Sequence, residues 1–213
     1  MNIEFRNVSF HYKKPYDIIR DFSHKFESGK ISFIRGKNGS GKTTLSKLIC
    51  GILRAQKGEI LIDNQNIKTK RTAQIADDIG YLFQKADMQL FATTVWEELS
   101  FVYEIDKKLS LENKRKINEI LKEFKLDKLK DSFPLTLSGG EKQRLALATI
   151  FIRDVKFLIL DEPFSAIDRE GETFLAGLIT NFVKKGGGAI VISHENLPAP
   201  LHADEIVVLG EGI

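Results

Sequence analysis

The stretch that most limits what this chain can fold into is Gly36-Lys37-Asn38-Gly39-Ser40-Gly41-Lys42-Thr43. It fits the pattern G-x-x-x-x-G-K-[ST], which requires a buried strand before it and a helix after it. Both neighbours are predicted, because an apolar run at 31–34 precedes the stretch and an apolar helical pattern from Thr43 to Leu53 follows it. We therefore expect a strand–loop–helix unit here rather than an isolated glycine-rich turn.

The composition of this loop predicts a phosphate-binding site. Glycines let the backbone curl until successive N–H groups point at phosphate oxygens, and the N-terminus of the following helix adds partial positive charge. Lys42 can reach the β- and γ-phosphates of a nucleotide, and the Thr43 hydroxyl can hold Mg²⁺. The residues predicted to bind a nucleoside triphosphate are Gly36, Lys37, Asn38, Gly39, Ser40, Gly41, Lys42, Thr43 and Thr44.

Apolar runs predict the rest of an α/β core. Continuous rather than alternating hydrophobicity is typical of parallel strands that are covered on both faces. Helical patterns from Thr43 to Leu53 and from Gly171 to Lys185 alternate with such runs, which favours an α/β sheet. The predicted strands are 31–34, 79–83, 157–160, 189–192 and 206–209.

Composition narrows the class of protein. The chain has 213 residues, 42% of them hydrophobic, and a net charge of +3. This length suits one large domain or two small ones, and so small an excess of positive charge does not by itself indicate nucleic-acid binding. The single cysteine, Cys50, excludes an intramolecular disulfide, and we expect it to be a small buried hydrophobic residue. No run of 18 apolar residues occurs, so no membrane-spanning segment is expected.

The stretch 85–153 has a different, helical character. Thr94 and Glu97 have the spacing of a capping box, and Ser110 can cap the next helix. A further helix is predicted from Glu141 to Arg153. We expect a single domain over residues 1–213, with a nucleotide-binding core at about 1–84 and 154–213 and a helical insertion at about 85–153.

A second pattern supplies carboxylates. The apolar run 157–160 ends in Asp161 and Glu162. Open α/β sheets bind ligands at the carboxyl ends of their strands. Beside a phosphate-binding loop, Asp161 is predicted to hold Mg²⁺, and Glu162 is predicted to polarise an attacking water as a general base.

Between the loop and these carboxylates lies the stretch Leu137-Ser138-Gly139-Gly140-Glu141-Lys142-Gln143-Arg144. It matches the LSGGE-type signature, and the chain resembles an ATP-binding-cassette (ABC) ATPase domain over nearly its whole length. The resemblance implies an α/β fold with a P-loop NTPase (RecA-like) core, an antiparallel β subdomain and an inserted α-helical subdomain. It also implies four further motifs, at Tyr12, Gln84, Ser165 to Asp168 and His194.

The same resemblance implies which residues bind nucleotide and metal, with ATP and Mg²⁺ as cofactors. Tyr12 would stack on adenine, and Gln84 would join Thr43 and Asp161 at Mg²⁺. Ser138 and the N–H groups of Gly139 and Gly140 would bind the γ-phosphate held by an opposite subunit, so that two domains enclose two ATP molecules head to tail. Asp168 would bridge the two sites.

The catalytic residues implied by the resemblance are three. Glu162 would be the base, His194 would contact the γ-phosphate and position it, and Lys42 would neutralise charge on the phosphates. Since each complete site needs groups from two chains, an isolated monomer is expected to hydrolyse ATP poorly.

The segment after Gln84 resembles the corresponding segment of energy-coupling-factor (ECF), or cobalt-type, importer ATPases. Asp87, Gln89, Leu90 and Phe91 fit its pattern, whereas Ala86 replaces the usual proline. In that subfamily the segment meets a membrane scaffold protein, so these four residues are expected at the coupling surface, with Leu90 and Phe91 facing the partner. The alternative is that the segment only begins a helix of the helical subdomain, with Leu90 and Phe91 in its core. Trp96 and Phe101 are expected to belong either to the subdomain core or to the coupling surface.

The resemblance implies a cytoplasmic ATPase on the inner face of the cell membrane that drives an importer of a vitamin or metal ion. Its partners would be a second ABC ATPase subunit, identical or related, and integral membrane subunits that include an ECF scaffold and a substrate-binding component. Many ECF ATPases carry a C-terminal extension, whereas this sequence ends at Ile213. Three explanations stay open: pairing depends mainly on ATP and the scaffold, the partner ATPase contributes more to it, or the chain is shortened. Neither the transported substrate nor the direction of transport follows from the sequence.

Other functions stay open at this point. The chain could serve another ABC importer or an exporter, or a non-transport ABC machine acting on nucleic acid or ribosomes. The sequence has no long coiled-coil insertion and no second cassette, and basic clusters such as 114–116 are expected to be solvated surface, so no nucleic-acid partner is predicted. A module that binds ATP without hydrolysing it is disfavoured, because Lys42, Asp161, Glu162 and His194 are all present.

Overall fold

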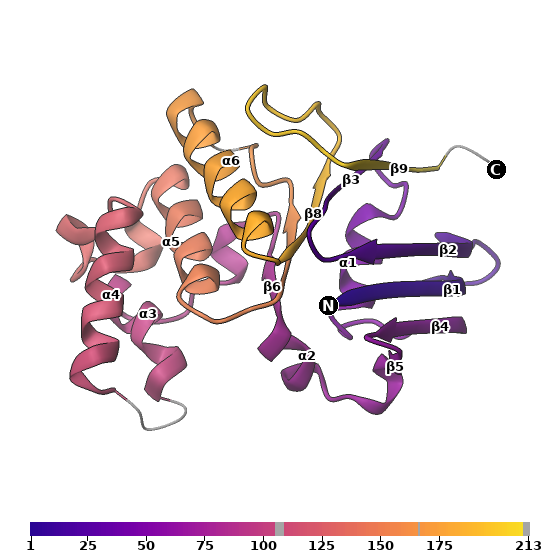
Figure 1. The fold of residues 1–213 in the computed structure, drawn as a ribbon, viewed down its shortest axis with the longest axis horizontal. Helices are drawn as coiled ribbons and strands as arrows, with labels where there is room; N and C mark the ends of the chain where they lie inside the picture. The colour runs from indigo at the N-terminus through magenta and orange to yellow at the C-terminus, as the bar shows by residue number, and fades with distance from the viewer. Residues whose placement is uncertain (105–108, 166, 211–213) are drawn as a thin grey trace.

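The computed structural model describes residues 1–104, 109–165 and 167–210 (Figure 1). Its strands are β1 (Asn2–Phe10), β2 (Ile19–Glu27), β3 (Ile31–Gly36), β4 (Lys57–Ile62), β5 (Gln65–Asn66), β6 (Ile79–Leu82), β7 (Phe157–Asp161), β8 (Gly188–Ser193) and β9 (Glu205–Leu209). Its α-helices are α1 (Lys42–Ile49), α2 (Thr72–Asp78), α3 (Val95–Glu104), α4 (Leu111–Glu123), α5 (Gly139–Phe151) and α6 (Arg169–Lys184). A 3₁₀ turn, η2 (Ala86–Met88), lies between β6 and α3.

Five strands form a parallel sheet in the order β6-β7-β8-β3-β9. Side chains alternate across it, so that Leu158 and Leu160 of β7 belong to one buried cluster and Phe157 and Ile159 to another. Burial on both faces explains why β3, β7 and β8 are almost continuously apolar. The edge strand β9 was also expected to be buried, but Ile206 (64%) and Val208 (46%) are exposed there. Because the strands are parallel, the segments that follow β3, β7 and β8 leave the same edge of the sheet. The predicted α/β core is confirmed.

A second sheet, in the order β2-β1-β4-β5, is antiparallel. Phe5 and Val8 of β1 are buried in the cluster that also holds Leu45 and Leu48 of α1, so α1 lies between the two sheets (Figure 1). The three-residue spacing from Phe5 to Val8 breaks the usual alternation because the pairing register of β1 shifts there, at Asn7, which has φ 47°.

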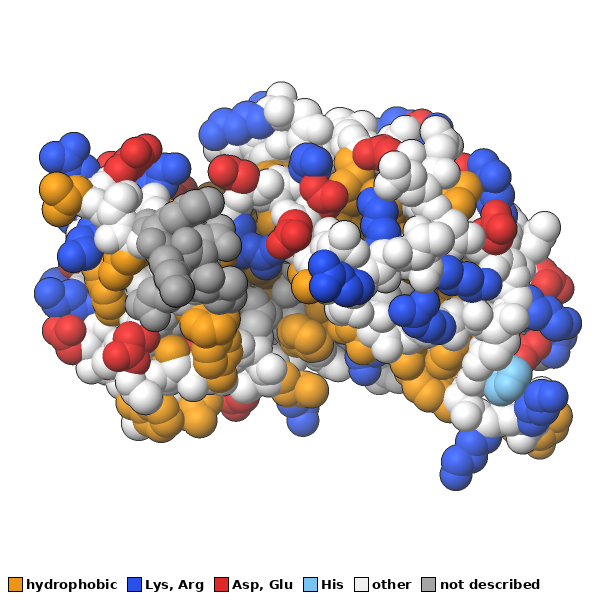
Figure 2. All heavy atoms as spheres, turned by 90° about the horizontal axis from the view of Figure 1, so that it is seen from below, with side chains coloured by type: hydrophobic (Ala, Val, Ile, Leu, Met, Phe, Trp, Pro, Cys, Tyr) orange, Lys and Arg blue, Asp and Glu red, His pale blue; other side chains and the backbone are white. Residues whose placement is uncertain are grey.

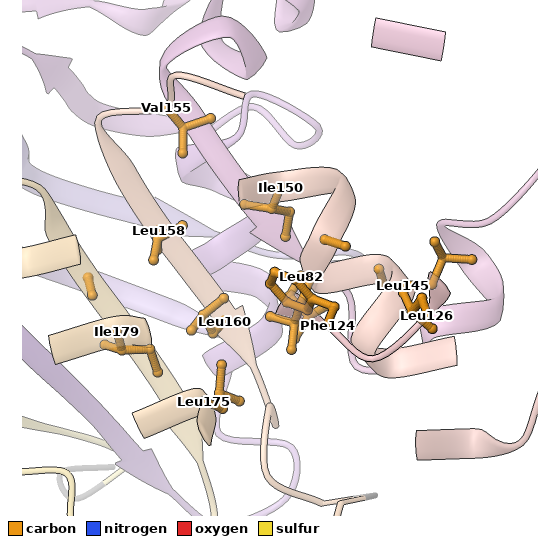
Figure 3. Packing of buried hydrophobic residues seen from close by; sticks show 14 of the residues in the cluster. Leu82, Phe124, Leu126, Leu145, Ile150, Val155, Leu158, Leu160, Leu175 and Ile179 are labelled. Atoms are coloured by element: carbon orange, nitrogen blue, oxygen red, sulfur yellow. The ribbon is translucent and has the colours of Figure 1, made fainter. Parts of the chain in front are cut away.

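Helices α3, α4 and α5 form a layer at one end of the parallel sheet, with α6 beside them (Figure 1). Figure 3 shows their shared core, in which Leu158 and Leu160 lie near Ile150 of α5 and near Leu175 and Ile179 of α6. This layer occupies the stretch that was predicted to be a helical insertion.

Aromatic packing and a cap fix the outermost helix of this layer. The ring of Phe124, fully buried at the end of α4, meets the ring of Phe174 of α6 edge to face, with centroids 5.4 Å apart. At the other end of α4, Asn113 N donates to Ser110 Oγ at 3.1 Å. The predicted Ser110 cap is therefore confirmed.

One helix is clearly shorter than predicted, and one predicted capping box is only half formed. The helix expected from Thr43 to Leu53 ends at Ile49, because Gly51 adopts φ 67° and turns the chain. Glu97 N donates to Thr94 Oγ1 at 3.1 Å, as the capping box predicts, but the Glu97 carboxylate accepts from the Thr93 hydroxyl instead of closing the box.

Cys50 follows α1 and is 8% exposed. Burial raises the pKa of its thiol to about 12, so the thiolate is not populated at neutral pH. This environment fits the expected apolar role.

The surface carries charges of both signs. On the face shown in Figure 2, Lys and Arg side chains are interspersed with Asp and Glu, and hydrophobic side chains are exposed between them. Within the described ranges, every helix is too short or too polar to cross a bilayer.

Candidate nucleotide site

A pocket of about 410 Å³ opens at the carboxyl edge of the parallel sheet. It brings together predicted residues from four separate parts of the chain. Its described lining consists of Tyr12, Ile18, Asn38, Gly39, Gly41, Lys42, Thr43, Thr44, Gln84, Asp161 and Glu162. A larger hollow of about 620 Å³, at the opposite edge beside Lys156 and Gly187, contains none of the residues predicted to bind phosphate.

The loop between β3 and α1 has the geometry of a phosphate cradle. Gly39 and Gly41 have φ 84° and 96°, values that other residues adopt only with strain, and Gly41 precedes the first turn of α1. Lys42 is 7% exposed and donates to the carbonyl oxygens of Gly36 (2.7 Å) and Lys37 (3.2 Å). Ser40 Oγ is buried without a hydrogen-bond partner among the described residues. A buried lysine, an unpaired hydroxyl and a helix N-terminus together fit a bound phosphate.

Thr43 and Asp161 supply a pair of oxygen atoms beside this cradle. Thr43 Oγ1 donates to Asp161 Oδ2 at 2.7 Å, and Asp161 is 1% exposed. Burial raises the pKa of the Asp161 carboxyl, the Thr43 hydrogen bond opposes this, and the Glu162 carboxylate adds to it. Gln84 lines the same pocket. A hydroxyl, a carboxylate and an amide oxygen are the donor types that Mg²⁺ prefers, so these residues fit that ion.

Glu162 is buried and held on both carboxylate oxygens. Its Oε1 accepts from the backbone N of His194 (3.0 Å) and lies 2.8 Å from the His194 ring Nδ1, while its Oε2 accepts from Ser193 Oγ (2.9 Å). The hydrogen bond to Glu162, with the charge of that carboxylate, raises the pKa of the exposed His194 ring. Glu162 has φ 52°, which is uncommon for a residue other than glycine and is typical of functional sites.

Tyr12 lies at the rim of the pocket. The residue is 56% exposed, its ring packs edge to face with that of Phe10 with centroids 5.0 Å apart, and its hydroxyl lies 3.3 Å from Thr44 Oγ1. An exposed, positioned ring at this point is suited to stacking on a planar base.

The signature residues lie outside this pocket. Ser138 caps α5, whose first residues are Gly139 and Gly140, through a capping box with Glu141. Hydrogen bonds from Ser138 lower the pKa of the Glu141 carboxyl. This exposed helix N-terminus is a second anion-binding geometry, separate from the first.

Asp168 also lies outside the pocket lining. It caps α6, with its Oδ1 accepting from Gly171 N at 2.8 Å. Of the predicted stretch Ser165 to Asp168, Ala166 lies outside the described residues.

Comparisons with known proteins agree with this arrangement. The profile of the ABC transporter family matches residues 19–165. The chain belongs to the ABC transporter family. It is 38% identical over 195 residues to the energy-coupling factor transporter ATP-binding protein EcfA1 of Thermotoga maritima, covering 92% of this chain and 73% of that protein.

A solved structure of an ABC transporter component is also similar to this chain. This ABC protein resembles cbiO1 from Clostridium perfringens, described as part of the ABC transporter complex cbiONQ, with a TM-score of 0.82 and 30% identity over 99% of this chain and 85% of that one. A relative from Clostridium tetani, 34% identical over 210 residues, is longer, and this chain spans 47% of it. The resemblance to ABC ATP-binding proteins, with relatives among ECF transporters, is confirmed.

The segment after Gln84 in this ABC protein corrects one prediction. Leu90 was expected to face a partner, but it is 6% exposed and packs in the core with Val95 and Leu99. The exposed apolar side chains here are Met88 (70%) and Phe91 (63%), and the ring of Phe91 meets that of Phe101 with centroids 4.6 Å apart.

Two polar residues of this segment, Asp87 and Gln89, contact α5. Asp87 Oδ1 lies 3.0 Å from Lys142 Nζ. Gln89 Nε2 donates to Ala146 O and to Thr149 Oγ1, both at 3.1 Å. Their side chains therefore tie the segment to the helix that begins at the signature.

Sequence reasoning missed two buried polar residues of this ABC protein. Ser193 bonds Glu162, and its position directly before His194 was the available signal. Glu98, 6% exposed, accepts from the backbone N of Phe91 (2.9 Å) and of Ala92 (2.8 Å) and so fixes the loop before α3. Nothing in the sequence separates Glu98 from its exposed neighbour Glu97. Trp96 is half-buried against the helical core, whereas Phe101 is 42% exposed.

Proposed function

We propose that this chain is the ATP-hydrolysing subunit of a membrane transporter and works as a pair of ABC domains around two ATP molecules. The observation that carries the proposal is the pocket in which Lys42, the Thr43–Asp161 pair and Glu162 meet. A phosphate cradle, an oxygen donor pair and a buried carboxylate are the groups that hydrolysis of a phosphoanhydride needs. The division into a core at about 1–84 and 154–213 and a helical subdomain at about 85–153 belongs to the same proposal.

Binding is assigned to the loop and its neighbours. The backbone N–H groups of residues 36–41 and the N-terminus of α1 hold the β- and γ-phosphates, Lys42 neutralises their charge, and Tyr12 stacks on adenine. Thr43, Asp161 and Gln84 would hold Mg²⁺. When bound, that ion supplies positive charge next to the phosphate oxygens as they become more negative.

Glu162 is assigned as the general base. It takes a proton from the water whose oxygen attacks the γ-phosphorus, and the bond from that phosphorus to the β–γ bridging oxygen breaks, releasing ADP and phosphate. His194 holds Glu162 Oε1 and positions the γ-phosphate. Lys42 stabilises the developing charge.

Pairing follows from the separation of the two anion sites. Ser138, Gly139 and Gly140 are not among the described residues that line the pocket, so a complete site is assembled from the pocket of one chain and the signature of another. Asp168 would bridge the two sites. The second subunit is either a copy of this chain or a related ATPase.

Coupling to membrane subunits is assigned to the segment after Gln84, with Phe91 and Met88 as its contact side chains. An apolar groove of about 240 Å³ adjoins it, lined among others by Ile52, Ile79, Phe83 and Gln89. Such a groove accommodates an apolar helix end of a scaffold protein. With ECF transporter relatives, we infer an importer of a vitamin or metal ion, with this chain on the inner face of the membrane. An exporter or another importer is the alternative.

Phosphate release from Mg–ATP by the chain paired with its second subunit, under conditions where the unmodified protein turns over, tests the enzymatic part. Glu162→Gln is expected to lower turnover by about 10²–10⁴-fold, the usual contribution of a general base. Glu119→Gln, the same change on the exposed face of α4, serves as the matched control and is expected to leave turnover unchanged. Equal turnover in all three proteins would reject Glu162 as the base.

Gel filtration with ATP tests the pairing. The Glu162→Gln variant, loaded with Mg–ATP, is expected to elute as a dimer. The double variant that also carries Lys42→Ala is expected to elute as a monomer. A variant that binds ATP yet stays monomeric would reject pairing with a second copy and require a related chain.

A further inference from the structure

Ser193, the last residue of β8, joins two parts of the site without being one of the described residues that line the pocket. It is 6% exposed. Its Oγ donates to Glu162 Oε2 at 2.9 Å and accepts from Glu195 N at 3.1 Å. One hydroxyl therefore connects the carboxylate of Glu162 to the backbone on the far side of His194.

The two carboxylate oxygens of Glu162 are held unequally. Oε1 has two contacts, with the backbone N and the ring Nδ1 of His194. Oε2 has one, from Ser193, among the residues that the structure describes. Each carboxylate oxygen has about two acceptor positions, so Oε2 is the oxygen with a position left for another donor. A water molecule that gives up its proton would meet Glu162 at Oε2, the oxygen that Ser193 holds.

We propose that Ser193 is a positioning residue for ATP hydrolysis, whose hydroxyl fixes Glu162 Oε2 where the attacking water donates its proton. This inference rests on the proposed role of Glu162 as general base. Without the hydroxyl, Glu162 keeps its Oε1 contacts to His194 and its backbone φ of 52°, but Oε2 loses the bond that holds it and is placed less firmly. A catalytic group that is off its working geometry loses rate even though it is still present.

The structure also predicts which kinetic constant changes. Ser193 makes its described side-chain bonds to Glu162 and Glu195, not to the loop at 36–43 or to Tyr12. Nucleotide binding therefore keeps its contacts when Ser193 changes, and the loss is confined to the chemical step.

Steady-state phosphate release at saturating and subsaturating Mg–ATP tests this role. Ser193→Ala is expected to lower kcat by about 10- to 100-fold, the range for losing a hydrogen bond to a charged group, with KM for ATP unchanged within about twofold. Ser193→Thr keeps the hydroxyl and is expected to recover most of kcat. A Ser193→Ala variant with unchanged kcat, or a Ser193→Thr variant as slow as Ser193→Ala although folded, would overturn the proposal.

Ser32→Ala is the matched structural control. Ser32 lies in β3 of the same sheet, is fully buried, and its Oγ donates to the carboxylate of Glu205, away from the pocket. Ser32→Ala removes the same kind of bond, so the melting temperature of this variant is expected to fall. Its kcat per folded molecule is expected to stay unchanged. If Ser32→Ala reduced kcat as much as Ser193→Ala, the effect would be one of general stability, and the proposal would fail.

A double-mutant cycle with Glu162→Gln separates this inference from the function on which it rests. If Ser193 acts through Glu162, Ser193→Ala has no further effect on the residual single-turnover rate of Glu162→Gln. If Ser193→Ala lowered the rate equally in the unmodified chain and in Glu162→Gln, the role of Ser193 would be overturned while that of Glu162 would stand. Absence of Mg-dependent hydrolysis in the unmodified chain paired with its partner would instead overturn the proposed function.

Discussion

Lys142 Nζ lies 3.0 Å from Asp87 Oδ1, which joins the first turn of the signature helix to the turn that follows Gln84. Lys142 is largely buried (18% of its side chain exposed), whereas Asp87 is mostly exposed (61%). Beside this ion pair, Gln89 reaches the middle of the same helix. A displacement of the segment after Gln84 therefore acts directly on α5, which carries Ser138 at its start.

The first prediction concerns the strength of this pair. Asp87→Asn and Lys142→Met should each destabilise the chain, and their effects should be non-additive by about 0.2–1 kcal/mol, as for a partly exposed ion pair. Urea unfolding of the two single variants and the double variant measures this coupling. Added salt should reduce it, because exposed charges are screened. Fully additive effects would mean that the contact contributes nothing.

The second prediction separates Leu90 from its neighbour Phe91. Leu90→Ala should cost about 2–5 kcal/mol of unfolding free energy, because the side chain is buried, and Leu90→Asp more. Phe91→Ala should cost little, because that ring is 63% exposed, and should weaken co-purification with the membrane subunits. Thermal unfolding and co-purification of the Leu90 and Phe91 variants measure these effects. A stable Leu90→Asp protein would contradict the burial of Leu90.

The third prediction concerns His194 and pH. Glu162 raises the pKa of the His194 ring above its ordinary value, so Glu162→Gln should lower that pKa. The stability contributed by the pair is complete below the unfolded pKa of about 6.5 and is lost as pH rises through the folded value. NMR titration of the ring protons reads out the shift. An unchanged His194 titration in Glu162→Gln would show that the two side chains are not coupled.

The fourth prediction uses two glycines with opposite surroundings. Gly177 lies on the exposed side of α6 with open space where a Cβ would be, so Gly177→Ala should stabilise the chain by about 0.5–1 kcal/mol. A Cβ at Gly80 of β6 would lie 2.3 Å from Ile150 Cγ2, so Gly80→Ala should cost about 1–3 kcal/mol. Denaturant unfolding of both variants tests this prediction. It would be refuted if the two substitutions changed the free energy of unfolding in the same direction.

Sequence reasoning found the parallel sheet because each of its strands is continuously apolar. It placed none of the antiparallel strands from the residues themselves. β2 alternates weakly, with Phe22 and His24 half-exposed, and the register shift in β1 interrupts its period. α2 was also missed, since Ile75 is its single buried residue among those described.

At the site, motif spacing predicted the glycine-rich loop and the strand-end residues that line the pocket. It could not rank Leu90 against Phe91, because the segment lies in a 3₁₀ turn and loop without helical or strand periodicity. It also could not find Ser193, since the hydrogen bond that gives the residue its significance joins positions 31 apart.

Thr43 and Asp161, joined at 2.7 Å, are 118 positions apart in the chain. The proposed metal-binding pair therefore exists only when α1 and β7 are both in place in the folded chain. A nucleotide that needs both residues binds the folded chain and not its precursors, and stabilises it in proportion to ln(1 + [ATP]/Kd). Millimolar ATP would thus act on maturation as well as on turnover, and a fragment with an intact Gly36–Thr43 loop would gain nothing from it.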